Sequence, residues 1–286
     1  VLKDLERWDD AISCFRRALA LDPQYINAHI NIGNALNQMG RYDEASLHLF
    51  ESIKLNPNSP EAYNNLGLMY HEGWGLLNEA TESFVKALSL APELTEAHYN
   101  LGNAYSAQGR FDEALSSYSE VLHLNPNHVM AHGNIGNVYK KQSRFEEAIV
   151  YYEKALRLDP NFEEMYYNIG LVHLSSGSSD EAFNCLRRAA KSYPENGLIW
   201  AAWADSLVSY NFEKVDENLQ SDLIKLLNHP MVSPRCLASP ILGALTHVSE
   251  FSKVMALTSK SSNVDSQIYK ELAGDLSKIP LMIEIL

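Results

Sequence analysis

The sequence has few cysteines, fewer basic than acidic residues, and no long hydrophobic run. Its 286 residues include three cysteines, too few and too scattered for a disulfide framework or a zinc ribbon. The 23 lysines and arginines against 36 aspartates and glutamates give a net charge of −13, which argues against a nucleic-acid-binding surface. No apolar run approaches the ~20 residues of a membrane-spanning helix, and Val1 opens no signal peptide. We therefore expect a cytoplasmic chain that binds neither nucleic acid nor membrane.

The short motifs of common catalytic and cofactor sites are also missing. The sequence has no glycine-rich phosphate loop, no His-Glu-x-x-His, no paired cysteine ligands and no nucleophile elbow. His29, His98 and His132 recur at one position of a repeat, where we interpret them as packing residues rather than metal ligands. We expect no catalytic residue, no cofactor and no metal site in the chain as given.

What the sequence does contain is an internal repeat. Six prolines recur at intervals of 34 or 35 residues, and six alanines and five glycines keep the same register. The prolines are Pro23, Pro57, Pro92, Pro126, Pro160 and Pro194; the alanines are Ala11, Ala45, Ala80, Ala114, Ala148 and Ala182; the glycines are Gly33, Gly67, Gly102, Gly136 and Gly170. This period is typical of a helix-turn-helix repeat.

The segments 97–105 (AHYNLGNAY), 109–114 (GRFDEA) and 122–126 (LHLNP) resemble the tetratricopeptide repeat (TPR) family. The resemblance implies an all-α, right-handed superhelix, an α-solenoid of about five full repeats plus a half repeat and a capping helix. The repeats are expected at 26–59, 60–94, 95–128, 129–162 and 163–196, after a half repeat at 5–25. We assign 1–207 to this solenoid with its capping helix, and 208–286 to a non-repeat helical unit, with one of its helices at 218–228.

Glycine inside a helix costs roughly 1 kcal/mol relative to alanine, so the five glycines in register indicate that another helix approaches closely. We expect the alanines of the second helix to form the other side of that contact. Gly40, Gly109 and Gly177 fall where the first helix ends and are expected to be left-handed. Cys14 and Cys185 share one position of the second helix, where small core residues are expected.

One repeat has an extra residue. Gly67 and Ala80 are 13 positions apart, one more than in the other repeats. We expect an insertion in the turn at 73–77, because loops tolerate length changes, with Trp74 as an exposed docking point in the alternative interpretation.

Asparagine recurs beside the glycines without an evident packing reason. Asparagine occupies the position two residues before each of the five glycines, and in three repeats it also occupies the position directly after the glycine. The two asparagines of such a repeat are three residues apart, so they share one face of the helix. This resembles the asparagine ladder in the TPR part of O-linked N-acetylglucosamine transferase. The resemblance implies a concave groove that grips an extended peptide, with candidate binding residues Asn31, Asn34, Asn65, Asn100, Asn103, Asn134, Asn137, Asn168, Tyr99, Tyr167, Lys140 and Lys141.

Two alternatives concern this face. The asparagines could instead bond the neighbouring repeat and hold the superhelical pitch. A carboxylate clamp of the chaperone-binding type is disfavoured, because Lys140 and Lys141 are the only basic pair at the groove positions. Those two lysines would favour an acidic stretch of ligand.

We therefore expect a non-catalytic protein-interaction scaffold that binds an extended peptide or a partner helix. The sequence does not begin with Met and enters the repeat pattern mid-unit, so we expect a fragment. In the leading alternative it is the substrate-docking arm of a glycosyl-, sulfo- or methyltransferase whose catalytic domain follows Leu286. Self-association through the groove or the capping helix is a third possibility.

Overall fold

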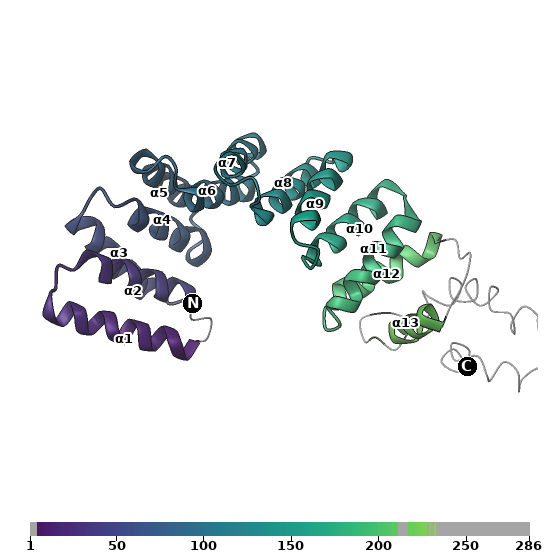
Figure 1. Cartoon of the computed structure of the whole chain (residues 1–286), viewed down its shortest axis with the longest axis horizontal. Coiled ribbons are helices and arrows are strands. Elements are labelled where there is room, and N and C mark those ends of the chain that lie inside the picture. The colour runs from purple at the N-terminus through teal and green to yellow at the C-terminus, as the bar shows by residue number, and fades with distance from the viewer. Residues whose placement is uncertain (1–4, 211–216, 228, 230–231, 233–286) are drawn as a thin grey trace, which may run out of the picture. The chain divides into compact units, whose positions relative to one another are not determined.

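The computed structural model describes residues 5–210, 217–227, 229 and 232, and its regular structure is helical (Figure 1). No β-strand occurs in this part of the chain. Two compact units are present, residues 1–144 (unit 1) and residues 145–286 (unit 2). The all-α prediction is confirmed.

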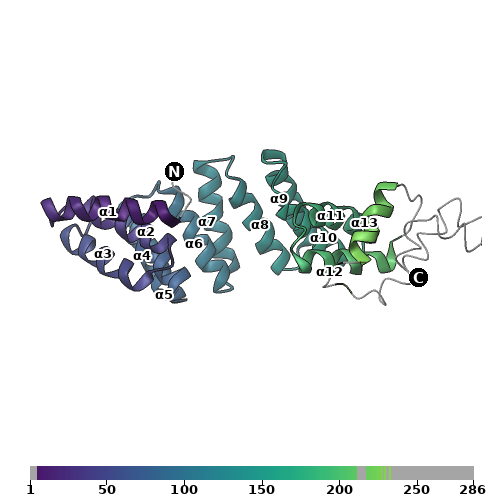
Figure 2. The same ribbon diagram turned by 90° about the horizontal axis from the view of Figure 1, so that it is seen from below.

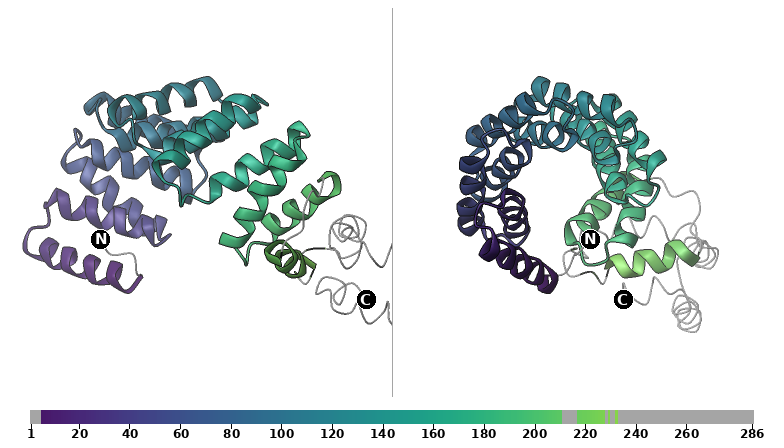
Figure 3. Two further views of the ribbon diagram at one scale, coloured as in Figure 1. Left: turned by 45° about the vertical axis from the view of Figure 1, so that its right-hand side comes forward. Right: turned by 60° about the vertical axis from the view of Figure 1, so that its left-hand side comes forward.

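Unit 1 is a half repeat followed by packed helix pairs. Figure 2 shows α6, α7 and α8 side by side, and Figure 3 shows the purple and blue helices of this unit from two further directions. The first helices of the repeats are α2 (Ile26–Gln38), α4 (Pro60–Leu68), α6 (Thr95–Ala107) and α8 (Val129–Lys141). The second helices are α1 (Leu5–Leu21) of the half repeat, α3 (Tyr42–Leu55), α5 (Leu77–Leu90) and α7 (Phe111–Leu124).

The glycines inside the first helices allow the second helix of the same repeat to approach closely. A Cβ added to Gly102 would lie 2.6 Å from Cε1 of Tyr118, and one on Gly67 would lie 2.5 Å from Cε1 of Phe84. The predicted close approach is confirmed, but its partner is not the repeat alanine. Ala114 is fully buried, yet the atoms nearest to Gly102 belong to the residue one turn later, whose longer side chain extends across the interface.

The turns inside the repeats follow the prediction. Gly40, Gly109 and Gly177 have φ values of +70°, +75° and +79°, which L side chains rarely adopt. Each second helix of a full repeat has at least one carboxylate in its first turn, such as Asp112 and Glu113 in α7, where the helix dipole favours negative charge.

The extra residue of the second helix pair, α4 and α5, is not accommodated where we expected it. Instead of a longer loop at 73–77, α4 continues into a π-helical turn, Met69–Gly73, in which the Trp74 N–H donates to the Met69 carbonyl at 3.3 Å. A π-turn absorbs one additional residue within a helix while keeping its backbone groups hydrogen-bonded. Gly73 is required there, because a Cβ would lie 2.4 Å from the Tyr42 ring.

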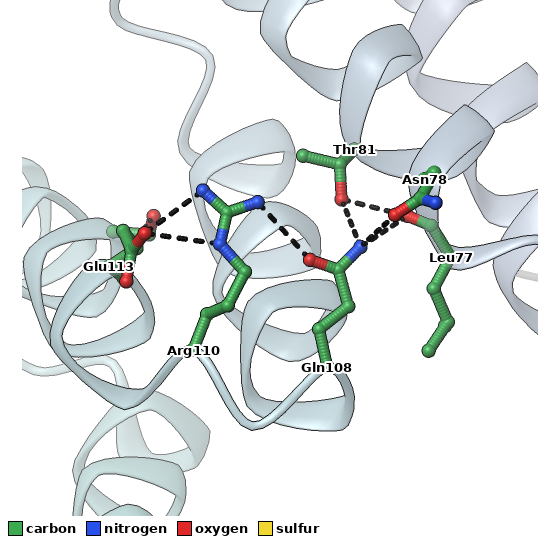
Figure 4. Close-up of polar contacts among 7 residues, drawn as sticks. Leu77, Asn78, Thr81, Gln108, Arg110 and Glu113 are labelled. Carbon is green, nitrogen blue, oxygen red and sulfur yellow. Dashed lines mark hydrogen bonds and ion pairs between the residues drawn. The ribbon is translucent and has the colours of Figure 1, made fainter.

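The turn after the π-helix is joined to the following repeat by one glutamine (Figure 4). Gln108 donates from Nε2 to the Leu77 carbonyl at 2.8 Å and to Thr81 Oγ1 at 3.0 Å. Its Oε1 accepts from Arg110 Nη1 at 3.3 Å, and Arg110 also binds Glu113. The start of α5 is thus connected to the α6–α7 turn.

Unit 2 contains α9 (Phe145–Leu158), α10 (Glu164–Ser176), α11 (Ser179–Ser192) and α12 (Gly197–Ser206), then a 3₁₀ turn (Leu207–Ser209) and α13 (Glu217–Leu227). Trp200 and Trp203 of α12, the predicted capping helix, are buried in one core with Leu223 of α13. Asp222 of α13 accepts from Arg187 and Lys191 of α11.

The predicted helix at 218–228 corresponds to α13. The remainder of the predicted 208–286 unit lies almost entirely outside the described residues, as does Cys236.

The expectation that Cys14 is a core residue is wrong. Cys14 is exposed and Cys185 is half-buried. The equivalent His48 is covered by α2, the first helix of its own repeat, whereas α1 belongs to a half repeat and has no such partner among the described residues.

Candidate functional site

Each recurring histidine hydrogen-bonds a backbone carbonyl at the end of the preceding repeat. Nε2 of His29, His98 and His132 lies 3.2, 2.9 and 3.0 Å from the carbonyl of the proline six residues earlier, namely Pro23, Pro92 and Pro126. A carbonyl only accepts, so each Nε2 carries the hydrogen. This role explains the repeat of histidine without a metal.

Several asparagines of the predicted ladder connect neighbouring repeats. Asn100 donates from Nδ2 to Asn64 Oδ1 at 3.0 Å. Asn134 donates to Asn103 Oδ1 at 2.8 Å and to the Tyr99 hydroxyl at 3.0 Å. These bonds join α4 to α6 and α6 to α8, as the structural alternative to a peptide ladder requires.

The same amides keep hydrogen-bonding capacity that the neighbouring repeats do not use. Asn103 engages its Oδ1, which accepts from Asn134 and from the Tyr118 hydroxyl at 2.7 Å, but within the described residues its Nδ2 has no acceptor. The side chains of Asn34 and Asn65 likewise bond to no described residue, although Asn65 is only 9% exposed. An amide that is neither paired nor solvated is costly, so these groups are open to water or a ligand.

A cavity of about 310 Å³ lies where this row is densest. It brings together five of the predicted site residues, Asn103, Asn134, Asn137, Lys140 and Lys141. His71, Ser106, Ala107 and Tyr118 complete its lining. All of it belongs to unit 1.

The lining of this cavity is basic and polar. No aspartate or glutamate of the described chain lines it, whereas two lysines and a histidine do. Lys141 is exposed, 3.4 Å from Ser106 Oγ and 6.0 Å from the centre of the Phe111 ring, and forms no ion pair with any described residue. Burial raises the pKa of the Tyr118 hydroxyl, so it stays protonated and donates to Asn103.

Apart from Lys140, the sequence analysis missed a second row of residues, which lies four positions after the repeat glycines of unit 1. The residues at this offset are Asn37, His71, Ser106 and Lys140, and the last three all line the cavity. Asn37 instead donates from Nδ2 to the Asn65 carbonyl at 2.9 Å. These residues could have been recognised by their constant distance from the glycine in the sequence. They were overlooked because the four side chains differ in chemistry.

The other predicted site residues lie outside the cavity. Asn31 is exposed on α2. Tyr167 and Asn168 belong to unit 2, where Tyr167 packs against the core around Trp203 and Asn168 is 5% exposed.

The described residues contain neither a metal-binding cluster nor a membrane-spanning helix. No group of three or more His, Cys, Asp or Glu side chains there could hold a metal ion. None of the helices in that part of the chain is long and apolar enough to cross a membrane.

Comparison with known proteins gives curated relatives that share only a short segment with this chain. Protein O-mannosyl-transferase Tmtc3 of Drosophila melanogaster is 28% identical over 116 residues, which is 36% of this chain and 12% of that protein. The chain spans only 10–14% of the length of the curated relatives that it matches.

Solved structures resemble the chain over a larger part. The crystal structure of MamA is 30% identical, with a TM-score of 0.52, and the match covers 57% of this chain and 95% of that one. YrrB, described as a TPR protein with an unusual peptide-binding site, is 22% identical with a TM-score of 0.53, over 65% of this chain and 95% of its own. At that identity the likeness to YrrB shows the fold.

Family models match most of the repeat region. A TPR repeat model matches residues 1–40, 33–72 and 75–109, and tetratricopeptide repeat models match 95–128, 129–162 and 163–196. Together the matches cover residues 1–72 and 75–196, well over half of the chain. The chain therefore belongs to the tetratricopeptide repeat family.

Proposed function

We propose that this chain is a non-catalytic scaffold that binds an extended peptide along the first helices of unit 1. Tetratricopeptide repeats form a fold suited to protein interaction, and the observation that carries the proposal is the unused hydrogen-bonding capacity of the amide row. Asn34, Asn65 and Asn103 each present at least one amide group that no described residue satisfies.

The hydrogen bonds of Asn100 and Asn103 support this proposal, because only one end of each amide is used. Where Asn100 donates from Nδ2 to Asn64, its Oδ1 has no described partner, and where Asn103 accepts through Oδ1, its Nδ2 has none. One end of the Asn100 and Asn103 side chains therefore holds the adjacent repeat, while the other end can pair with a peptide N–H or carbonyl. Because the backbone is common to all peptides, the row would tolerate many sequences.

The test uses the whole chain and a phage-displayed library of random peptides. Selected peptides are synthesised with a fluorescent label, and their affinities for the parent and for N34A/N65A are measured by fluorescence anisotropy. We expect the double variant to bind about tenfold more weakly, since each lost hydrogen bond contributes roughly 0.5–1.5 kcal/mol.

The free energy of unfolding in urea is measured beside the affinity. We expect little change for N34A/N65A, because neither amide joins another repeat, and a clear loss for N100A/N134A, whose amides do. N58A, in an exposed turn of unit 1, is the matched control. Failure to select any peptide, or equal affinity of N34A/N65A and the parent, would contradict the proposal.

A second candidate function follows from the relatives. The match to Tmtc3 favours a role as the docking or regulatory arm of a larger transferase, in which the same amide row would hold the acceptor polypeptide. Sequencing the full-length transcript beyond Leu286 decides it: a transferase domain in the same reading frame supports this role, and a stop codon directly after Leu286 contradicts it.

A further inference from the structure

We infer that the cavity among His71, Asn103 and Lys141 accepts the carboxylate of an aspartate or glutamate side chain of the bound peptide. This inference rests on the proposed function and adds a side-chain preference to a row that otherwise contacts the peptide backbone. It concerns a single subsite, formed by α6, α7, α8 and the π-turn after α4.

The first argument is the local charge. The protein has a net charge of −13, yet every ionisable residue that lines this cavity is basic or a tyrosine. Acidic residues elsewhere in unit 1 are engaged with basic side chains, as Glu44 is with Arg41 and Glu113 with Arg110. A basic cavity in an acidic chain selects an anionic group.

The second argument is the set of donors without an acceptor. Lys141 has only a long contact to the Ser106 hydroxyl, and Asn103 Nδ2 has no acceptor in the described residues. An ammonium and an amide N–H₂ in one cavity match the two oxygens of a carboxylate, and hydrogen bonds between charged partners are the stronger ones. A neutral ligand group would leave the ammonium without a counter-charge.

The third argument is the way the chain places His71. Its position is four residues after Gly67, and in the following repeats the same position holds Ser106 and Lys140. The π-turn of residues 69–73 contains His71 and keeps it in the lining of the cavity despite the extra residue. One row of the repeat thus supplies a ring nitrogen, a hydroxyl and an ammonium to one cavity.

The size of the cavity limits the bound group to about one amino-acid side chain. A volume of about 310 Å³ accommodates an amino-acid side chain but is at the lower limit of the cavities that enclose drug-sized molecules. The cavity also opens on the same helices as the amide row, so a peptide bound there can insert one side chain. An acidic side chain is the one whose charge the lining complements.

The experiment compares peptides selected from the random library on three versions of the whole chain: the parent, K141Q, and K54Q, which removes an exposed lysine of α3 that does not line the cavity. We expect the parent and K54Q to select peptides with an aspartate or glutamate at one fixed position, and K141Q to lose that preference.

A double-mutant cycle between peptide and protein then measures how strongly the acidic side chain interacts with Lys141. Replacing the selected Glu by Gln in one labelled peptide is expected to weaken its binding to the parent and to K54Q about tenfold, and to K141Q by less than about twofold. Because Lys141 is exposed, K141Q is expected to fold, and K140Q/K141Q provides a second variant with the same expected loss.

The outcomes separate the two proposals. Peptides that bind through the amide row but carry no fixed acidic position, or that lose equal affinity on the parent and on K141Q, would overturn the carboxylate subsite and leave the scaffold standing. A library that yields no binder to the parent would overturn both.

Discussion

At the scale of single residues, one histidine pair distinguishes the first complete repeat from the others. Nδ1 of His29 and Nδ1 of His48 are 3.0 Å apart, and His29 uses its Nε2–H for the Pro23 carbonyl. In neutral His29 the remaining Nδ1 accepts, so His48 donates. Protonation of both rings would bring two N–H groups face to face. The equivalent position carries Ser83 and Ser117 in the next repeats.

This pair predicts loss of stability in acid. Burial, helped by the nearby His29 and Arg16 and opposed by Glu44, lowers the pKa of His48 below its usual 6.5. The unfolded chain therefore takes up the proton first, so the contribution of His48 to stability is constant above about pH 7 and falls as the pH drops below ~6.5 toward the folded pKa. We expect thermal unfolding between about pH 7 and pH 5 to show a larger drop in Tm for the parent than for H48S.

The control for this prediction is H123Q, which changes an exposed histidine of α7 and should keep the pH dependence of the parent. If H48S and the parent lose the same Tm over this range, His48 is not the responsible group.

At the scale of elements, the π-turn shows how an additional residue is absorbed without disturbing the stack. The chain emerges from Met69–Gly73 into a left-handed Gly75, φ +65°, and α5 then begins at Leu77. The Leu76 N–H bonds back to the Tyr70 carbonyl at 2.8 Å. What holds this turn against the next repeat is Gln108, which reaches Leu77, Asn78 and Thr81 (Figure 4).

Replacing Gln108 by alanine is expected to lower the free energy of unfolding by about 1–2 kcal/mol, because the half-buried side chain loses three hydrogen bonds and leaves the Leu77 carbonyl without this donor. Urea denaturation followed by circular dichroism measures this free energy of unfolding. Q38A, an exposed residue of α2, should change it by less than about 0.5 kcal/mol. Equal effects of Q108A and Q38A would show that the connection does not stabilise the turn.

At the scale of the whole molecule, most packing is between helices that are consecutive in the sequence, both within a repeat and between neighbouring repeats. The net charge of −13 describes the chain as a whole, and the charge at one site can differ from it. Such a chain repels extended polyanions at long range, while a single basic cavity can still accept one acidic side chain that enters it.

We therefore expect no binding of nucleic acid. A fluorescent single-stranded oligonucleotide should show no rise in anisotropy with the parent even at low salt, where phosphate contacts are strongest. Binding that weakens steeply with added salt would contradict this prediction and would point to a basic surface that the net charge conceals.

The sequence by itself determined the repeats, their helical class and the places where a helix must be approached closely or must turn. Gly102 and Gly109 show why: a helix interior that needs glycine, and a turn with φ of +75°, are constraints within one repeat and recur with its period. It also placed the asparagines on one helix face, because residues three apart lie together.

Only the tertiary structure decided what those asparagines do and where the extra residue goes. Whether Asn134 bonds Asn103, and which amide end stays open, depends on the crossing of helices that are about a full repeat apart in sequence. The choice between a longer loop and a π-turn at Met69–Gly73 is likewise a balance of backbone hydrogen bonds and the contact with Tyr42. The sequence period shows which residues share one face of a helix. Hydrogen bonds and cavities form between the faces of different helices, and their geometry is set by how the helices pack.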